Sequence, residues 1–346
     1  MEDLREKLIF SHSEDFMDLA DEGQGRKYFI LADSKVWNNF GKIIEDSLQN
    51  RGIIYFLYEV EGGEKAKTGE EYMKIISEMA MQGISRKDAL MAIGGGTIGD
   101  IGGFVAATYM RGIGFVQVPT TLLAMVDSSI GGKNGINLKE GKNLAGTIRP
   151  ADFIYQNTEF LKTLPKEQII SAMGEIIKYG IIEGNGLWNT LNSEEFQDSL
   201  RAESFNGKIL LDIIKQCVNI KQQYVSMDQF DKGIRKTLNL GHTAAHGIEK
   251  LSEYSISHGE AVAKGLIIET KVAEHNGFCS SSTVNEIKNL IVALGLDPNE
   301  IFDKEEIREA AKNDKKKAGD LIDLPIIKEI GNCTVNTIDY CNFCWD

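Results

Sequence analysis

The fold is decided by Ala89-Leu-Met-Ala-Ile-Gly94-Gly-Gly-Thr-Ile-Gly-Asp100-Ile-Gly-Gly-Phe104, where a continuous apolar run leads directly into the densest glycine cluster of the chain. Such an apolar run is typical of a β-strand buried on both faces. The residues that follow predict a helix ending near Met110-Arg111-Gly112. Glycines at a strand-to-helix turn let the backbone approach a pyrophosphate, and the helix N-terminus offers N–H groups. The cluster is not a strict GxGxxG motif, so a dinucleotide site and a tight turn both remain open.

Similar apolar runs surround this one. They have strand length and recur through the first half of the chain, at residues 27–31, 53–57 and 115–118. Strands buried on both faces and separated by helical stretches predict a parallel α/β sheet. Asp33, just after the first of these runs, is placed like a carboxylate that holds a ribose hydroxyl.

After Pro165 the β pattern fades and long helical periodicities replace it. These helices are expected at residues 167–182, 206–226, 242–253 and 258–276. The sequence therefore predicts two domains. Residues 1–165 are expected to form an α/β domain with a Rossmann-like parallel sheet, and residues 166–346 a mostly α-helical domain.

The overall composition excludes several classes of protein. A hydrophobic content of 42% and a charged content of 26% are those of an ordinary globular protein. The net charge of −13 argues against a general nucleic-acid binder, which needs a basic face. No apolar run has membrane-span length, and the first residues do not resemble a signal peptide. Five cysteines without framework spacing fit reduced thiols. We expect a cytoplasmic protein.

Three of the five histidines lie close together, in Gly241-His242-Thr-Ala-Ala-His246 and Ser257-His258-Gly-Glu260. Imidazoles together with an upstream carboxylate, Glu175, suit Zn²⁺ or a similar divalent ion, and three protein ligands leave one position open for substrate. Ser257 to Glu260 is typical of a capping box, so His258 is expected in the first turn of a helix. The spacing of His242 and His246 places both on one helix face and suggests them as joint ligands.

Several segments together resemble the 3-dehydroquinate synthase family of the sugar phosphate cyclases. They follow the family's order along the chain and comprise Gly94 to Asp100, Arg111-Gly112, Pro119-Thr120-Thr121, Asp127-Ser-Ser-Ile-Gly-Gly-Lys133, Gly141-Lys142-Asn143, Gly174-Glu175-Ile-Ile-Lys178, Arg235 to His246 and Ser257 to Glu260.

The resemblance implies a lyase of the shikimate pathway, which leads to chorismate and the aromatic amino acids. Its substrate would be 3-deoxy-D-arabino-heptulosonate 7-phosphate, and its products 3-dehydroquinate and inorganic phosphate. The family oxidises the C5 hydroxyl with NAD, eliminates phosphate, reduces the ketone again and closes the carbocycle by an intramolecular aldol reaction. NAD and a divalent metal, Zn²⁺ or Co²⁺, are the implied cofactors, and a homodimer is the implied assembly.

The resemblance also assigns roles to individual residues. It implies Glu175, His242 and His258 as metal ligands and moves His246 from the metal to the substrate. The residues implied at the substrate are Arg111, Lys133, Asn143, Lys178, Lys221, Arg235, Asn239, His246 and Lys316. The residues implied at NAD are Asp33, Glu64, Lys67, Gly94, Gly95, Gly96, Thr97, Asp100, Thr120, Thr121, Leu123, Asp127, Ser128, Lys133, Lys142 and Thr163.

Three other functions compete with this interpretation. A sibling cyclase, of the amino-dehydroquinate, 2-deoxy-scyllo-inosose or valiolone synthase type, would act on another sugar phosphate. Asn239 and the segment from Asp127 to Lys133 argue against the inosose and valiolone types. An NAD- and metal-dependent alcohol dehydrogenase would not require the cations Lys133, Lys178, Lys221 and Arg235. A non-catalytic binding module would not require the ligand set. Small sugar phosphates, rather than nucleic acids or membranes, are the expected partners.

Overall fold

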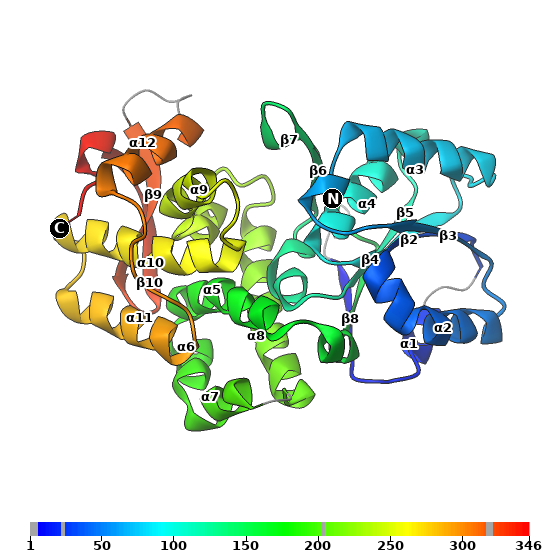
Figure 1. The fold of residues 1–346 in the computed structure, drawn as a ribbon, viewed down its shortest axis with the longest axis horizontal. Coiled ribbons are helices and arrows are strands. Elements are labelled where there is room, and N and C mark those ends of the chain that lie inside the picture. Colours follow the sequence, from blue (N-terminus) through cyan, green and yellow to red (C-terminus); the bar gives the residue numbers. More distant parts are fainter. Residues whose placement is uncertain (1–5, 22–24, 203–204, 316–320, 346) are drawn as a thin grey trace. The chain divides into compact units, whose positions relative to one another are not determined.

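The computed structural model describes residues 6–21, 25–202, 205–315 and 321–345, and its helices and strands are labelled in Figure 1. Contacts within the chain divide it into two compact units. Unit 1 comprises Met1–Leu164 and Asn206–Val218, and unit 2 comprises Pro165–Phe205 and Asn219–Asp346. Helix α8 (Gly207–Met227) therefore contributes its first part to unit 1 and its last part to unit 2.

Unit 1 is built on a six-stranded sheet in which every pairing is parallel. Its central strands are almost entirely buried, as their continuous apolar sequences require. In spatial order the strands are β1 (Lys7–Ser11), β8 (Phe153–Asn157), β5 (Gly114–Pro119), β4 (Ala89–Gly94), β2 (Tyr28–Asp33) and β3 (Tyr55–Val60).

The strand order reverses between β2 and β4. From β2 the chain passes to β3 on one side, then returns to place β4 on the other side of β2 and continues outward to β5. Ligands of open α/β sheets bind outside the carboxyl ends of the strands at such a switch point. Strand β2 ends at Asp33 and β4 ends at Gly94, so the fold places Asp33 and the glycine cluster at this edge of the sheet.

The remaining elements of unit 1 flank the sheet. Glycine at position 102 lets α4 lie directly against β4, because a Cβ there would be only 2.8 Å from the Ala92 Cβ. Strands β6 and β7 form a separate antiparallel hairpin. These elements are α1 (Met17–Asp21), α2 (Ser34–Asn50), α3 (Gly69–Met81), α4 (Gly96–Thr108), β6 (Lys133–Leu138) and β7 (Gly141–Ile148).

Unit 2 is mostly helical. Helices α5 and α10 are buried over most of their surfaces, and α10 packs against α5, α9 and α11. An antiparallel pair, β9 and β10, completes the unit. Its elements are α5 (Lys166–Glu183), α6 (Asn185–Asn192), α7 (Glu194–Arg201), α9 (His242–Leu251), α10 (His258–His275), α11 (Ser281–Ala293), α12 (Lys304–Lys315), β9 (Leu321–Glu329) and β10 (Asn332–Asp339).

The predicted fold class is confirmed: a parallel α/β sheet precedes a mostly helical region. The expected strands appear as β2 to β5, and the four expected helices appear as α5, α8, α9 and α10. The expectation that β structure fades after Pro165 was wrong for the C-terminal hairpin. Pro325 lies inside β9, and proline within an apolar run argues against a strand unless the strand is an edge strand, as it is here.

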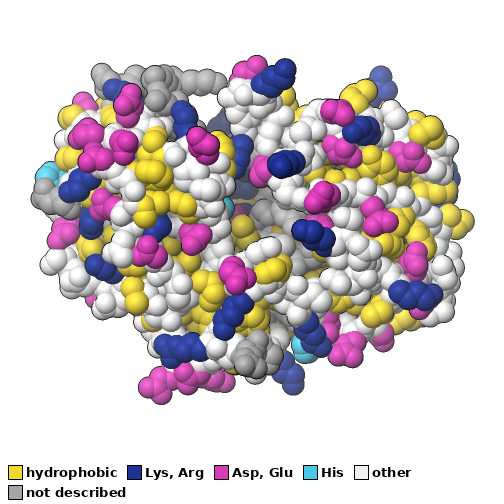
Figure 2. Space-filling view, in the orientation of Figure 1, with side chains coloured by type: hydrophobic (Ala, Val, Ile, Leu, Met, Phe, Trp, Pro, Cys, Tyr) yellow, Lys and Arg dark blue, Asp and Glu magenta, His cyan; other side chains and the backbone are white. Residues whose placement is uncertain are grey.

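Charged side chains of both signs are interspersed over the face drawn in Figure 2. The chain has 51 Asp and Glu residues and 38 Lys and Arg residues, and on this face the two signs of charge are mixed rather than separated. Within the described residues, every helix is too short or too polar to traverse a lipid bilayer.

Candidate active site

The candidate metal centre begins with a buried carboxylate in the middle of α5. Glu175 is 0% exposed, and Lys178, one turn later, is 2% exposed and forms an ion pair with Glu175 Oε2. A buried charge is costly unless partners compensate it, and such compensated pairs cluster at functional sites. The buried ion pair therefore indicates that α5 contributes to a functional site as well as to the core.

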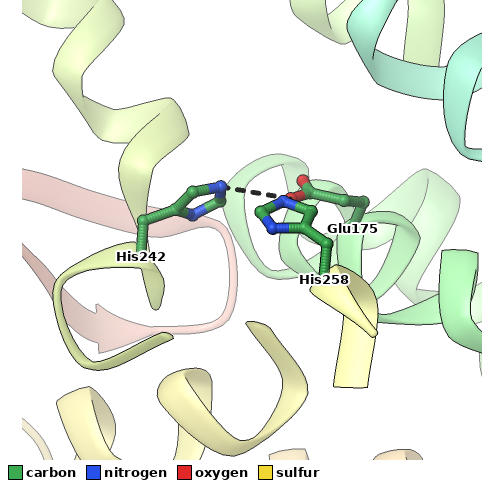
Figure 3. A group of neighbouring side chains, drawn as sticks. All are labelled: Glu175, His242 and His258. Carbon is green, nitrogen blue, oxygen red and sulfur yellow. Dashed lines mark hydrogen bonds and ion pairs between the residues drawn. The ribbon is translucent and has the colours of Figure 1, made fainter. Parts of the chain in front are cut away.

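Two imidazoles from other helices meet the same carboxylate. The Nε2 atoms of His242, at the start of α9, and of His258, at the start of α10, each lie 3.1 Å from Glu175 Oε1. Figure 3 shows both rings and the carboxylate pointing toward one another. One ligand atom from each residue lies within 4.8 Å of the others. This donor set of two imidazoles and a carboxylate fits a divalent ion such as Zn²⁺ with an open position.

The far side of each ring has its own partner. His242 Nδ1 lies 3.0 Å from the Leu240 carbonyl, and His258 Nδ1 lies 3.4 Å from Glu249 Oε1. Because Nδ1–H can donate to these oxygens, Nε2 is left with its lone pair toward the centre, which is the tautomer that binds a metal. Carbonyl and carboxylate partners of this kind orient histidine ligands in metal sites.

The electrostatics of the cluster also suit a cation. Burial raises the pKa of Glu175, but the charge of Lys178 and the contacts with His242 outweigh it and hold the pKa well below the usual range. Burial lowers the pKa of His242. Burial also lowers the pKa of His258, but the hydrogen bonds of His258 to Glu175 and Glu249 have the larger combined effect and raise this pKa to about 10. The two carboxylates thus favour a positive charge beside His258, which a proton or a metal ion can supply.

Close contacts at glycines bring the three helices together. A Cβ on Gly174 would lie 2.0 Å from the Gly259 carbonyl oxygen, and a Cβ on Gly259 would lie 1.7 Å from the Ser171 oxygen. A Cβ on Gly265 would lie 2.0 Å from the Gly241 oxygen. Helices α5 and α10 therefore touch directly beside Glu175 and His258, and α10 touches the start of α9 directly beside His242. The glycines fix the ligand spacing.

Gly259→Ala is expected to destabilise the fold and weaken metal binding. The added Cβ would overlap backbone, so α10 must shift and His258 with it; overpacking of this kind costs about 1–3 kcal/mol. Denaturant unfolding and metal content after dialysis measure the two effects. Gly69→Ala is the control, because its nearest neighbour would be 4.0 Å away. Equal behaviour of the two variants contradicts the role assigned to the glycine contact.

Further cationic and polar side chains assigned to the substrate lie in unit 2. Lys221 is 8% exposed, and Arg235 is 3% exposed with its Nη1 donating to the Gln229 carbonyl at 2.8 Å. His246 is exposed on α9, and its ring centroid lies 5.7 Å from that of His242. It is not part of the three-residue group of ligand atoms. Asn239 lines a cavity of about 370 Å³ together with Asp231, Lys236, Leu321, Ile322, Asp323, Pro325 and Thr337.

The glycine cluster of unit 1 has the features of an anion cradle. Helix α4 begins at Gly96, and its N-cap, Gly95, makes no side-chain cap. A Cβ on Gly96 would lie 2.7 Å from Ser128 Oγ. Within the described part of the chain, Thr120 Oγ1 and Ser128 Oγ are buried without a hydrogen-bond partner. Unpartnered hydroxyls and an uncapped helix start fit the pyrophosphate of a dinucleotide.

Three of the residues assigned to NAD, Asp33, Glu64 and Lys67, also contact neighbouring segments of unit 1. Asp33 caps α2, with Oδ1 accepting the Lys35 and Val36 N–H groups, so it has a structural role as well. Lys67 is 3% exposed and forms an ion pair with Asp100, and Glu64 accepts a hydrogen bond from Asn137 at 2.6 Å. Lys67 is thus a buried cation at the start of the segment that leads into α3.

Other assigned residues are distributed over unit 1. Arg111 and Asn143 are exposed and have positive φ angles of 69° and 56°. Lys133 and Lys142 lie on the β6–β7 hairpin, and Asp127 lies within a short helix at residues 124–128. Thr97 lies in the first turn of α4, and Leu123 directly precedes the short helix. The Thr121 hydroxyl accepts a hydrogen bond from the Ala124 N–H, and the Thr163 hydroxyl donates one to the Phe160 carbonyl. Lys316 lies outside the described residues.

One contributor to the metal centre, Glu249, is absent from the motifs of the sequence analysis. Its carboxylate orients His258 from two turns along α9 after His242. The spacing from His242 through His246 to Glu249 keeps all three on one face of the helix. That pattern could have suggested the residue, because a histidine ligand usually needs a partner for its second nitrogen.

Comparison with known sequences identifies relatives along most of the chain. Residues 57–171 match the family described as "3-dehydroquinate synthase N-terminal", and residues 172–317 match "3-dehydroquinate synthase C-terminal". The chain is 38% identical over 321 residues to the 3-dehydroquinate synthase of Clostridium acetobutylicum, covering 91% of this chain and 87% of that protein. It is 41% identical over 308 residues to that of Dictyoglomus thermophilum, covering 89% and 84%.

Solved structures show the same fold. The 2-epi-5-epi-valiolone synthase of Streptomyces hygroscopicus, solved with NAD⁺ and Zn²⁺, has a TM-score of 0.89 at 22% identity over 99% of this chain and 96% of that one. A 2-deoxy-scyllo-inosose synthase, solved with carbaglucose-6-phosphate, NAD⁺ and Co²⁺, has a TM-score of 0.85 at 25% identity, covering 97% and 94%. An iron-containing alcohol dehydrogenase of Thermotoga maritima has a TM-score of 0.66 at 14% identity, covering 98% and 96%.

The candidate metal ligands and the sequence relatives indicate the same family. Both family descriptions match in the expected order, and the aligned relatives cover most of their own length as well as most of this chain. This chain belongs to the 3-dehydroquinate synthase family.

Proposed function

We propose that this chain converts 3-deoxy-D-arabino-heptulosonate 7-phosphate to 3-dehydroquinate and inorganic phosphate, with NAD and a divalent metal, Zn²⁺ or Co²⁺, as cofactors. The observation that carries the proposal is the meeting of Glu175, His242 and His258 from three helices at one point. The same unit buries the cations Lys178, Lys221 and Arg235, which an anionic substrate requires. The identity to two 3-dehydroquinate synthases over about nine-tenths of the chain supports the choice of reaction.

The metal site prepares the substrate for oxidation. When bound, the metal ion supplies Lewis acidity that polarises the C4 and C5 oxygens of the substrate. Glu175 contributes one full negative charge to the ligand set, and the two imidazoles are neutral donors. Lys178 compensates the Glu175 charge from the other carboxylate oxygen. We assign His246 to a substrate oxygen, because it lies on the same helix as His242 without belonging to the ligand group.

The cationic side chains hold the two anionic groups of the substrate. Arg235 presents a planar fork that meets an oxyanion with two hydrogen bonds, whereas each lysine acts as a point charge. By family likeness we assign the phosphate and carboxylate to this set, completed by Arg111, Lys133, Asn143, Asn239 and Lys316. Charge-assisted hydrogen bonds of this kind each contribute roughly 1.5–3 kcal/mol.

We assign NAD to the carboxyl edge of β2 and β4 in unit 1. When bound there, NAD would supply a hydride acceptor for the substrate. Gly95 and Gly96 leave room for the pyrophosphate beside the Thr120 and Ser128 hydroxyls. The full NAD set is that given by the family likeness in the sequence analysis. In this proposal residues 1–165 form the NAD-binding domain and residues 166–346 the metal- and substrate-binding domain.

The enzyme is expected to need NAD⁺ only in catalytic amounts. One site both removes and returns the hydride, so substrate should be consumed without net NADH formation. Absorbance at 340 nm, followed together with phosphate release, measures both quantities. An absorbance rise stoichiometric with substrate consumed would place the chain among the dehydrogenases that share its fold.

A sibling cyclase is the second candidate. The specific observation in its favour is the high structural likeness to a valiolone synthase and an inosose synthase. Against it stands the sequence, which is 38% and 41% identical to 3-dehydroquinate synthases but 22% and 25% identical to those two siblings. The proposal extends to a cytoplasmic homodimer on family likeness alone, and light scattering on the purified protein measures the assembly.

A further inference from the structure

A buried glutamate outside all the motifs contacts the first turn of α9. Glu269 lies in α10 and is 1% exposed. Its carboxylate accepts three backbone hydrogen bonds: from Gly241 at 2.8 Å, from Thr243 at 2.7 Å and from Ala244 at 3.1 Å. These residues surround His242, the ligand with which α9 begins.

Helix α9 needs such an acceptor from elsewhere in the fold. Its N-cap, Gly241, has a left-handed conformation with φ of 80° and makes no side-chain cap, since glycine has no side chain. The first N–H groups of a helix have no partner within the helix and require an acceptor when they are buried. Glu269 supplies that acceptor, and its negative charge lies at the positive end of the helix dipole.

Glu269 lies on the same helix, α10, as the metal ligand His258, and it caps α9, which begins with the metal ligand His242. Glu269 follows His258 by about three turns, which places both on the same face of α10. The Gly265–Gly241 contact lies between them and holds the same start of α9. We propose that Glu269 is a positioning residue that orients His242 toward Glu175 and thereby tunes metal affinity. This inference rests on the metal site of the proposed function.

Glu269→Gln separates positioning from simple space filling. The amide has almost the same shape as the carboxylate, but its NH₂ group cannot accept a hydrogen bond. One of the two oxygens that now accept N–H groups would be lost, and a donor would face a donor at the start of α9. Thr270→Val is the matched control: it lies in the same helix, is 0% exposed, and loses only the hydrogen bond from its hydroxyl to the Leu266 carbonyl, which leaves α9 untouched.

The experiment measures metal binding on the full-length protein. Each chelator-treated variant is titrated with Zn²⁺ against a chromophoric chelator, and the Co²⁺-loaded form gives a visible spectrum that reports ligand geometry. Denaturant unfolding of the metal-free proteins measures any general loss of stability. We expect Glu269→Gln to lower Zn²⁺ affinity by about 10- to 100-fold and to change the Co²⁺ spectrum. Thr270→Val should keep the wild-type affinity and spectrum even if it is less stable.

The measured affinities and spectra test the positioning role of Glu269 separately from the proposed function. Wild-type affinity and spectrum in Glu269→Gln overturn the positioning role, as does an equal loss of affinity in Thr270→Val. If Glu269→Gln does not fold, Glu269→Asp decides: its shorter carboxylate should give a reduced affinity, and wild-type affinity overturns the inference. A wild type that binds no Zn²⁺ overturns the proposed function together with this inference, whereas failure of Glu269 alone leaves the proposed function intact.

Discussion

His258→Ala is expected to lose the metal and at least about three orders of magnitude in kcat. The variant removes one of the two imidazoles that the described residues bring to Glu175 Oε1, and the two remaining ligands cannot form the open three-ligand site. Lewis-acid stabilisation amounts to several kcal/mol of the barrier, so its loss should nearly abolish turnover. Metal content by inductively coupled plasma spectrometry and steady-state kinetics measure the two effects on the same preparation.

His246→Ala is the matched comparison on α9. Its ring lies near that of His242 but outside the ligand group, so the variant should keep the metal and lose rate. Equal metal loss in both variants would show that His242 and His246 are joint ligands, as their spacing along the helix suggests. Chelation of the wild type should likewise abolish activity, and Zn²⁺ or Co²⁺ should restore it.

Arg235→Lys is expected to lower kcat/KM by about tenfold or more, near 1.4 kcal/mol. The charge is kept, but the two-pronged donor is replaced by a point charge in a position that is only 3% exposed. Steady-state kinetics with the heptulosonate phosphate provide the measurement. Its anionic groups should respond to the lost fork because burial strengthens each charge-assisted hydrogen bond.

A surface arginine controls for the substitution itself. The Arg201 side chain is 62% exposed and contacts Asp198 and Gln197, both about one turn earlier in α7. Arg201→Lys should leave kcat/KM unchanged. If the two variants behave alike, Arg235 does not bind the substrate anion, and a sibling substrate becomes the better explanation.

Much of the fold follows from sequence patterns. Continuous apolar runs predict β2 to β5 because strands buried on both faces need no polar alternation. The capping box at Ser257 predicts the start of α10 and is present as expected. The edge strand β1 and its neighbour β8 lack an equally clear signal, and β9 contains a proline. Local pattern therefore predicts β2 to β5 but not β1, β8 or the C-terminal hairpin.

The metal centre depends on contacts that sequence spacing does not contain. Spacing alone pairs His242 with His246, whereas the structure brings His242 to Glu175 and His258 because glycines allow α5, α9 and α10 to touch. The family resemblance supplies the ligand set, since it carries three-dimensional information in its motifs. Glu249 and Glu269 belong to no motif, and the folded chain brings their carboxylates to His258 and to the first turn of α9.

The central claim is the reaction itself, and a single incubation tests it most directly. The purified protein with Zn²⁺, catalytic NAD⁺ and 3-deoxy-D-arabino-heptulosonate 7-phosphate is sampled over time for inorganic phosphate and for 3-dehydroquinate. We expect one phosphate to be released for each 3-dehydroquinate formed, with no accumulation of NADH. Phosphate release without the carbocycle, or turnover of another sugar phosphate while the heptulosonate phosphate remains unchanged, would contradict it.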